Sequence, residues 1–314
     1  MKTSSSTFEI VPQGEYSLEQ GANFIGAWHR APSASGDPEG HLHLAFLTDD
    51  ELAPVGVCLK QDSGGRVLGT VHGGAVETAV VVKQVERILS LDVDGRGWPD
   101  VGKRDPIVAR LQRMFPGFRP VNWSNAYEAA AWCVISSRIS MRQAQVVKDR
   151  MSRELGQEID VHGHALWTFP GPDRLAHLEK FPGLFGRKVE YLNALGRAAL
   201  AGEVDTETLR AMPPEEALKS LQKLPGIGAW GSQLVRLRAL SAVDELPSEE
   251  PRLMGAIRTE YGLATEPDQA TLERLAEKWS PYRMWVCVCL RRTLEGGAGM
   301  THSRASEGEI NNLG

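Results

Sequence analysis

The segment 224–228, with the sequence LPGIG, restricts the fold of this chain more than any other, because it places two glycines between two stretches of helical character. Residues 213–221 open with two prolines and two acids and then repeat apolar residues at helical spacing. Residues 229–240 resume that spacing with Leu234, Leu237 and Leu240 on one side. Gly226 and Gly228 supply backbone freedom for the reversal. The sequence therefore predicts a helical hairpin over residues 213–240.

A hairpin of this kind presents several backbone N–H groups and the N-terminus of its second helix to solvent. Both features attract anions, because the N–H groups donate hydrogen bonds and the helix dipole is positive at that end. The hairpin is therefore a predicted site for a phosphate oxygen, and it needs no basic side chain to bind one.

The length and the hydrophobic pattern predict an α+β protein. A chain of 314 residues is too long for one small core, so two or three packed units are expected. Short β-rich segments at 41–47, 54–59 and 66–71 predict an antiparallel sheet, and residues 76–91 predict a helix that covers one of its faces. From about residue 105 onward nearly every periodic segment is helical, including 127–155, 188–201, 269–277 and 283–294.

Charge and cysteine usage exclude some classes of protein. The net charge of −5 argues against a broad basic surface, although the segments 221–240 and 281–294 each carry three basic residues and no acidic one. Either the positive field is confined to one face, or these side chains are simply solvated. Four cysteines without a C-x-x-C pair support neither a zinc site nor an iron–sulfur loop, and reduced thiols and no cofactor are expected. Without a long apolar run or a signal peptide, a cytoplasmic, nucleoid-associated protein with no membrane segment is expected.

Further segments extend the hairpin into a family resemblance. In order along the chain, between about Val85 and Glu295, these are FPGFR at 115–119, AYEA at 126–129, RKVE at 187–190 and EKWSPYR at 277–283. Together with the hairpin they resemble the helix-hairpin-helix (HhH-GPD) DNA glycosylase superfamily, and within it the bacterial 3-methyladenine DNA glycosylase II family. The resemblance implies an N-terminal α+β domain with an antiparallel sheet over 1–95, a mostly helical glycosylase core of two subdomains over 96–298, and a disordered tail over 299–314.

The resemblance also implies a catalytic carboxylate. Such an enzyme flips the nucleotide out of the duplex and cleaves its glycosidic bond through an oxocarbenium-like sugar, which a nearby carboxylate stabilises. The family places an aspartate 22 residues after the second hairpin glycine, and counting from Gly228 reaches Glu250. Glutamate keeps the charge but adds a methylene, which displaces the carboxylate oxygens unless the backbone recedes. Glu249 and Asp244 are alternates, and the acid pair before Pro251 also fits a helix N-terminus.

Other site positions follow from the same resemblance. Trp230 matches a tryptophan of 3-methyladenine glycosylases, where bifunctional relatives carry a Schiff-base lysine, so lyase activity is not expected. Ser137 and Arg138 stand where relatives carry a glutamine and a wedge that intrudes into the duplex, and Arg291 stands where a relative has a pocket tryptophan. The predicted pocket residues therefore include Trp230, Ser137 and Arg291, and three aromatic candidates complete it: Tyr127, Trp132 and Trp285. Core packing for the aromatics and solvation for the arginines remain the alternatives.

The predicted function is that of a monofunctional DNA glycosylase that excises alkylated or modified purines. The alternative is a non-catalytic protein of the same fold that binds damaged DNA. The partner in either case is double-stranded DNA with a damaged base, bound by a monomer. The predicted DNA contacts are Gly226, Ile227, Gly228, Trp230, Gly231 and Arg138. By analogy with relatives, a sodium or potassium ion on the hairpin carbonyls near Leu224 and Ile227 is a further expectation.

Overall fold

The computed structural model describes residues 6–28, 34–247 and 250–300, and its contacts divide the chain into two compact units. Unit 1 is Met1–Gly97 with Pro116–Ala242, and unit 2 is Trp98–Phe115 with Val243–Gly314. The unit boundaries follow contacts in space and run differently from the boundaries at 95 and 298 expected from the sequence, which stay predictions.

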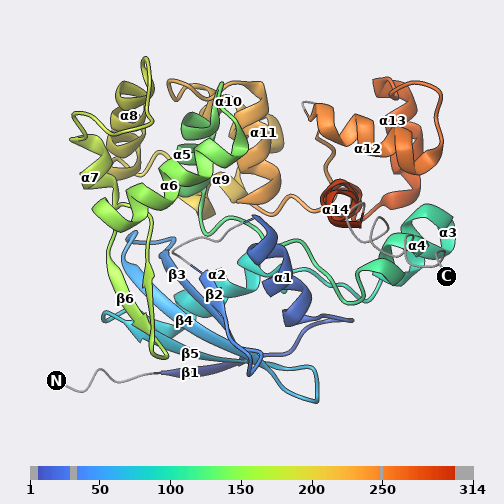
Figure 1. Ribbon diagram of the computed structural model, residues 1–314, viewed down its shortest axis with the longest axis horizontal. Helices are drawn as coiled ribbons and strands as arrows, with labels where there is room; N and C mark the ends of the chain where they lie inside the picture. The colour runs from blue at the N-terminus through green and yellow to red at the C-terminus, as the bar shows by residue number, and fades with distance from the viewer. Residues whose placement is uncertain (1–5, 29–33, 248–249, 301–314) are drawn as a thin grey trace, which may run out of the picture. The chain divides into compact units, whose positions relative to one another are not determined.

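Unit 1 begins with the antiparallel sheet that the sequence predicts, which confirms the α+β class. The sheet order is β1-β5-β4-β3-β2, and every neighbouring pair is antiparallel. Two helices, α1 and α2, contact this sheet (Figure 1). The elements are β1 (Thr7–Ile10), α1 (Leu18–Trp28), β2 (Ala34–Gly36), β3 (Leu42–Leu47), β4 (Pro54–Gln61), β5 (Val67–Gly73) and α2 (Thr78–Ile88).

A second, two-stranded sheet follows much later in unit 1, in the part of the chain where nearly every periodic segment is predicted to be helical. Strands β6 (Glu158–Val161) and β7 (His164–Trp167) form a hairpin that contacts β3 and β4 (Figure 1). Ile159, Val161 and Leu166 bury their side chains there against Ala45 and Cys58. This cover explains why every residue of β3 is buried rather than every second one.

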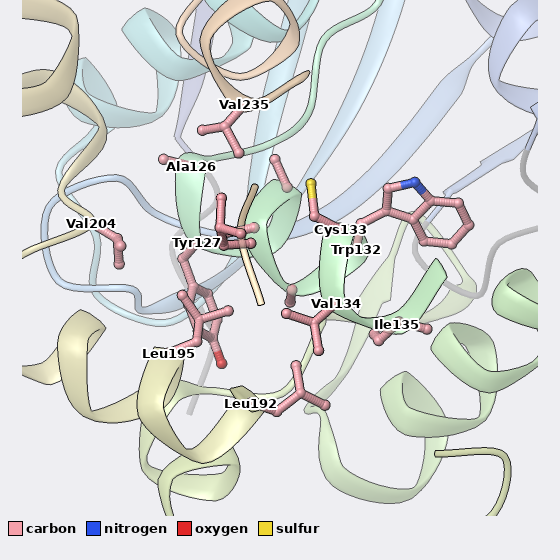
Figure 2. Packing of buried hydrophobic residues seen from close by; sticks show 14 of the residues in the cluster. Ala126, Tyr127, Trp132, Cys133, Val134, Ile135, Leu192, Leu195, Val204 and Val235 are labelled. Carbon is pink, nitrogen blue, oxygen red and sulfur yellow. The ribbon is translucent and has the colours of Figure 1, made fainter. Parts of the chain in front are cut away.

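The helical part of unit 1 is built around α5 (Ala126–Ser136). All of its residues are buried, as expected for a helix that is apolar on every side. Figure 2 shows its side chains projecting in several directions into the core. The remaining helices are α6 (Met141–Leu155), α7 (Pro172–Ala176), α8 (Lys188–Leu200), α9 (Thr206–Ala211), α10 (Pro214–Gln222) and α11 (Ala229–Arg238).

The predicted helical stretch 127–155 is in fact two helices, α5 and α6, separated at residues 137–140. Ser140 caps α6: its hydroxyl accepts a hydrogen bond from the Gln143 amide, and the Gln143 side chain accepts one from the Ser140 amide. This reciprocal capping box fixes the helix start, and the sequence signal for it is the Ser-x-x-Gln spacing.

Unit 2 joins two distant stretches of chain through a buried carboxylate. Asp105 caps α4 by accepting a hydrogen bond from the Ile107 amide at 2.9 Å, and its second oxygen accepts from the Tyr261 hydroxyl at 2.6 Å and from Trp279 Nε1 at 3.1 Å. The elements are α3 (Trp98–Arg104), α4 (Pro106–Met114), α12 (Pro251–Tyr261), α13 (Gln269–Ala276), the 3₁₀ helix η1 (Glu277–Trp279) and α14 (Arg283–Met300).

The C-terminal helix α14 continues to Met300, so the first two residues of the predicted tail 299–314 are helical. The rest of that prediction lies outside the described residues. Among the helices of the described ranges, none combines the length and the apolar character that a membrane crossing requires.

Candidate DNA-binding hairpin and catalytic carboxylate

The hairpin turn of unit 1 is held by two buried side chains. Leu224 and Ile227 are 7% and 5% exposed, and the Ile227 amide donates to the Leu224 carbonyl at 3.1 Å. Gly226 has a φ of +88°, and a Cβ there would lie 2.6 Å from the ring of Tyr191. Both the left-handed backbone and the close ring therefore require glycine at this position.

The second hairpin glycine, Gly228, does not supply the backbone freedom that the sequence analysis gave to both glycines. Gly228 is the N-cap of α11 with φ −96° and ψ −165°, which is extended backbone open to other residues, and a Cβ there would meet nothing within 4 Å. The protein itself therefore does not require a glycine here. Because Gly228 has no side chain, the space beside it on the outside of the hairpin is open.

The first turn of α11 offers a row of unused hydrogen-bond donors. No acceptor in the part of the chain that the structure describes faces the amides of Gly228, Ala229, Trp230 and Gly231. Gly228 and Ala229 are also exposed. These donors lie at the positive end of a ten-residue helix, and this arrangement suits an anion such as a phosphate.

The loop after α5 lies at the same end of unit 1 as the hairpin turn. The Trp123 amide donates to the Arg238 carbonyl at 2.7 Å, and Cys133 Sγ donates to the Gly231 carbonyl at 3.6 Å. The start of α5 thus lies beside the end of α11, so the two helices run antiparallel. The C-terminal end of α5, followed by Arg138, therefore lies at the N-terminal end of α11.

Arg138 has an unusual backbone at the tip of that loop. Its φ is +55°, and it is exposed, whereas Ser137 before it ends α5 with its hydroxyl donating to the Val134 carbonyl at 2.9 Å. A left-handed backbone is uncommon for a residue with a long side chain and costs roughly 1–2 kcal/mol. Such strain is typical of functional positions, and here it presents a guanidinium to solvent.

The predicted aromatic candidates are mostly core residues. Tyr127 is fully buried and its hydroxyl donates to the Pro170 carbonyl at 2.9 Å, and Trp132 is 3% exposed. Figure 2 shows both side chains among the buried residues of the unit 1 core. Trp285 is 1% exposed, in the core of unit 2 beside Trp98. Trp230 differs, because it is only partly buried where it packs on the unit 1 core.

The predicted carboxylate Glu250 is paired with another predicted site residue. Glu250 is the N-cap of α12, but its side chain makes no capping hydrogen bond. Instead, Oε1 accepts a hydrogen bond from Arg291 Nη1 at 2.6 Å, with side chains 26% and 16% exposed. Arg291 therefore holds one oxygen of this carboxylate.

The two alternates for the carboxylate have different outcomes. Asp244 accepts hydrogen bonds from Arg283 Nη1 at 2.7 Å, from the Ser280 hydroxyl at 2.9 Å and from the Arg283 amide at 3.4 Å. It is thereby engaged in fixing the start of α14. Glu249 lies outside the described residues.

The cysteines are free thiols buried in the fold. Burial raises the pKa of the Cys133 thiol to about 12, and burial likewise raises the pKa of Cys289 to about 12. At neutral pH these two thiols are therefore protonated and are poor nucleophiles.

Sequence reasoning missed a buried arginine that supports the hairpin. Arg87 of α2 is 1% exposed, donates to the Ala239 carbonyl at 2.6 Å at the end of α11, and pairs with Asp49 at 2.6 Å. It also donates to the carbonyls of Trp123 and Ser124, which precede α5. The available signal was a charged residue among the apolar positions of 76–91, which by itself does not distinguish a buried arginine from a solvated one.

Comparisons with known proteins give DNA glycosylases as relatives. No protein-family model matches the chain. It is 26% identical over 218 residues to a DNA-3-methyladenine glycosylase of Bacillus subtilis, covering 68% of this chain and 72% of the relative. It is 30% identical over 189 residues to DNA-3-methyladenine glycosylase 2 of Escherichia coli, covering 58% of this chain and 62% of the relative.

Solved structures extend the likeness to the whole fold. A 3-methyladenine DNA glycosylase from Archaeoglobus fulgidus superposes with a TM-score of 0.76 at 18% identity, over 90% of this chain and 97% of that one. An 8-oxoguanine glycosylase/lyase from Clostridium acetobutylicum, solved with double-stranded DNA containing cytosine opposite 8-oxoguanine, superposes with a TM-score of 0.65 at 15% identity, over 94% and 98%. In sequence and in fold the chain is therefore similar to members of the helix-hairpin-helix (HhH-GPD) DNA glycosylase superfamily.

Proposed function

We propose that this protein is a monofunctional DNA glycosylase of base excision repair that releases alkylated purines, with Glu250 as its catalytic carboxylate. The observation that carries the proposal is the state of Glu250: a partly exposed carboxylate that caps no helix amide and is held by one oxygen only. The names of the relatives in Bacillus subtilis and Escherichia coli support alkylated bases as the substrate class.

In the proposed reaction, unit 1 binds the duplex. The free amides of Gly228 to Gly231 donate to one phosphate, and the space beside Gly228 lets the phosphate approach the backbone. Arg138 fills the gap left by the flipped nucleotide, because its planar guanidinium stacks on bases and also contacts phosphate. Few basic side chains are then needed, which agrees with the net charge of −5.

Glu250 then acts on the sugar of the flipped nucleotide. As the glycosidic bond breaks, positive charge develops on the sugar, and the carboxylate stabilises it. Oε2, which Arg291 does not engage, faces this charge or orients the attacking water. Arg291 restricts the rotamers of the longer glutamate side chain, which offsets the extra methylene relative to the family aspartate.

The same ion pair is the observation that favours the alternative, a protein that binds damaged DNA without cutting it. A guanidinium at 2.6 Å partly neutralises the carboxylate and repels a developing cation. The two functions therefore differ in whether Oε2 alone supplies enough stabilisation.

Base release decides between them. The protein is incubated with duplex DNA treated with a methylating agent, and the released bases are identified. We expect release by wild type, and a decrease of about 10²-fold or more in Glu250→Gln with lesion binding retained. Glu249→Gln tests the alternate position, and we expect it to release bases at the wild-type rate. Absence of release by wild type with intact lesion binding establishes the binding function instead.

The absence of lyase chemistry is tested separately. Trp230 occupies the position where bifunctional relatives carry a Schiff-base lysine, so we propose that the enzyme leaves an intact abasic site. Borohydride should trap no covalent protein–DNA complex with wild type, and a trapped complex would contradict the proposal. The sodium or potassium ion near Leu224 and Ile227 also stays a proposal. The Leu224 carbonyl accepts one hydrogen bond and retains a second lone pair for it.

A further inference from the structure

Four side chains of unit 1, far from one another in sequence, direct nitrogen and sulfur atoms at one point. They are His41, His43, Cys58 and His162. Each offers one ligand atom, and all four atoms lie within 4.8 Å of one another. His43 is fully buried and Cys58 is 9% exposed, so half of the cluster is inside the fold.

The separations match those of a tetrahedral metal site. The His162 Nδ1 atom lies 3.3 Å from His41 Nδ1 and 3.4 Å from His43 Nε2. Cys58 Sγ lies 3.4 Å from His41 Nδ1 and 3.7 Å from His162 Nδ1. With zinc–nitrogen bonds of about 2.05 Å and a zinc–sulfur bond of about 2.3 Å, tetrahedral geometry gives about 3.35 Å between nitrogens and about 3.55 Å between nitrogen and sulfur.

Hydrogen bonding alone does not account for this cluster. A ring nitrogen carries either one in-plane lone pair or one N–H, so it forms one hydrogen bond. The His162 Nδ1 atom nevertheless has three close neighbours: His41 Nδ1, His43 Nε2 and Cys58 Sγ. A cation at the centre uses the lone pairs of all four atoms at once.

The backbone places these ligands without side-chain distortion. His43 and Cys58 are directly opposite each other in the β3–β4 ladder. His41 is two residues before His43 and so lies on the same side of the chain. His162 occupies the two-residue turn between β6 and β7, where its φ of +55° and that of Gly163, +83°, match a type I′ hairpin.

A carboxylate next to the cluster supplies further negative charge. Asp37 Oδ2 lies 3.7 Å from both His41 Nδ1 and His43 Nε2, while its Oδ1 accepts from the His41 amide at 3.0 Å. The His164 ring stacks on His43 with centroids 4.3 Å apart. The thiolate and the carboxylate together balance a divalent cation, and the packing fixes the ring of His43.

We propose that unit 1 holds a structural zinc ion on His41, His43, Cys58 and His162. Imidazole and thiolate donors in tetrahedral arrangement are the set that zinc prefers, and four protein ligands leave no open position for a substrate. The ion fastens the β6–β7 hairpin to the N-terminal sheet, joining residues 121 positions apart in the chain. Its role is stability of the sheet, separate from the proposed chemistry at Glu250.

Metal content is the direct test, on full-length protein whose affinity tag has been removed, because a histidine tag binds the same metals. The protein is stripped with a chelator, reloaded with zinc, desalted and analysed by mass spectrometry. We expect about one zinc per chain in wild type and in His177→Asn, a control histidine outside the cluster. We expect less than about 0.2 per chain in His162→Asn, in which asparagine keeps the left-handed turn.

Two further measurements separate ligand loss from misfolding. With cobalt in place of zinc, wild type should show the thiolate-to-metal charge-transfer band of a tetrahedral site, and Cys58→Ser should lose that band while remaining folded. Adding zinc to the stripped protein should raise the melting temperature of wild type by at least about 4 °C and leave that of His162→Asn unchanged. Equal zinc content in wild type and His162→Asn, or no retained zinc in reloaded wild type, overturns the proposal.

Discussion

The pair of Glu250 and Arg291 allows a quantitative test of the proposed site. At about 4 Å between charges and an effective dielectric constant of about 20, the gross attraction is on the order of 4 kcal/mol. Desolvation and the ordering of two long side chains oppose it. The side chains are only 26% and 16% exposed, so the net contribution of the pair to stability should be that of a hydrogen bond between charged groups, about 1.5–3 kcal/mol. The smaller contribution of a solvent-exposed ion pair does not apply.

The assay is a double-mutant cycle on the free energy of unfolding. Glu250→Gln, Arg291→Met and the double variant are compared with wild type by urea denaturation, with the m-value checked for constancy. We expect a coupling free energy of about 1.5–3 kcal/mol. Arg291→Met should cost more stability than the double variant, because it alone leaves a partly buried carboxylate without its partner.

The same variants report on orientation in the reaction. Arg291→Lys keeps the positive charge but replaces the planar donor by a point charge, so it isolates the positioning effect. We expect single-turnover base release to fall about tenfold to a hundredfold in Arg291→Lys, with little change in lesion affinity. A coupling free energy below about 0.5 kcal/mol, together with wild-type base release by Arg291→Lys, would refute the orienting role of Arg291.

Further predictions concern unit 1. Gly226→Ala should lower the free energy of unfolding by roughly 1–3 kcal/mol, because residue 226 has a left-handed backbone and the new Cβ would meet the Tyr191 ring. Gly228→Val should change the free energy of unfolding by less than about 1 kcal/mol but should weaken binding to abasic-site DNA. Equal binding by Gly228→Val and wild type would contradict the phosphate site. Arg138→Gly should raise the free energy of unfolding by roughly 1 kcal/mol, because glycine relieves the left-handed backbone strain, and it should lower the affinity for lesion DNA. Unchanged affinity would refute the proposal that Arg138 fills the gap left by the flipped nucleotide. Arg87→Leu should lower the free energy of unfolding by about 3–5 kcal/mol, measured by urea denaturation, since it leaves Asp49 without its partner. A plot of log affinity against log salt should have a shallow slope, and a slope that implies six or more neutralised phosphates would show that basic side chains, rather than amides, carry the contact.

Much of the fold follows from periodicity and glycine placement. The hairpin, the strands around 41–71 and the helix α2 were predictable because each combines a strong local pattern with a clear boundary signal. The β6–β7 hairpin was not, because each strand has four residues and its apolar side chains are explained only by the sheet they cover. The break between α5 and α6 was readable from Ser140 and Gln143, but the apolar pattern on both sides obscured it.

For the candidate site, the resemblance supplied a position but not the partners of the residue at that position. Counting from Gly228 reaches Glu250, yet no sequence rule pairs it with Arg291, since the pair is set by the packing of α12 and α14. The metal cluster shows the same limit. Its only local signals are the repeated His-x-His pairs at 41–43 and 162–164, and a search for C-x-x-C motifs passes over them.

The division of unit 2 between two stretches of chain has a consequence for synthesis on the ribosome. Unit 1 is complete once residue 242 has emerged, whereas α4 must wait for partners that begin at residue 243. At about 5–20 residues per second, the 156 positions between Asp105 and Tyr261 take roughly 8–30 s to translate. During that time Val108 and Leu111, both buried in the mature protein, are open to chaperones and proteases. A nascent chain therefore acquires its folded hairpin well before the helices that carry Glu250 and Arg291.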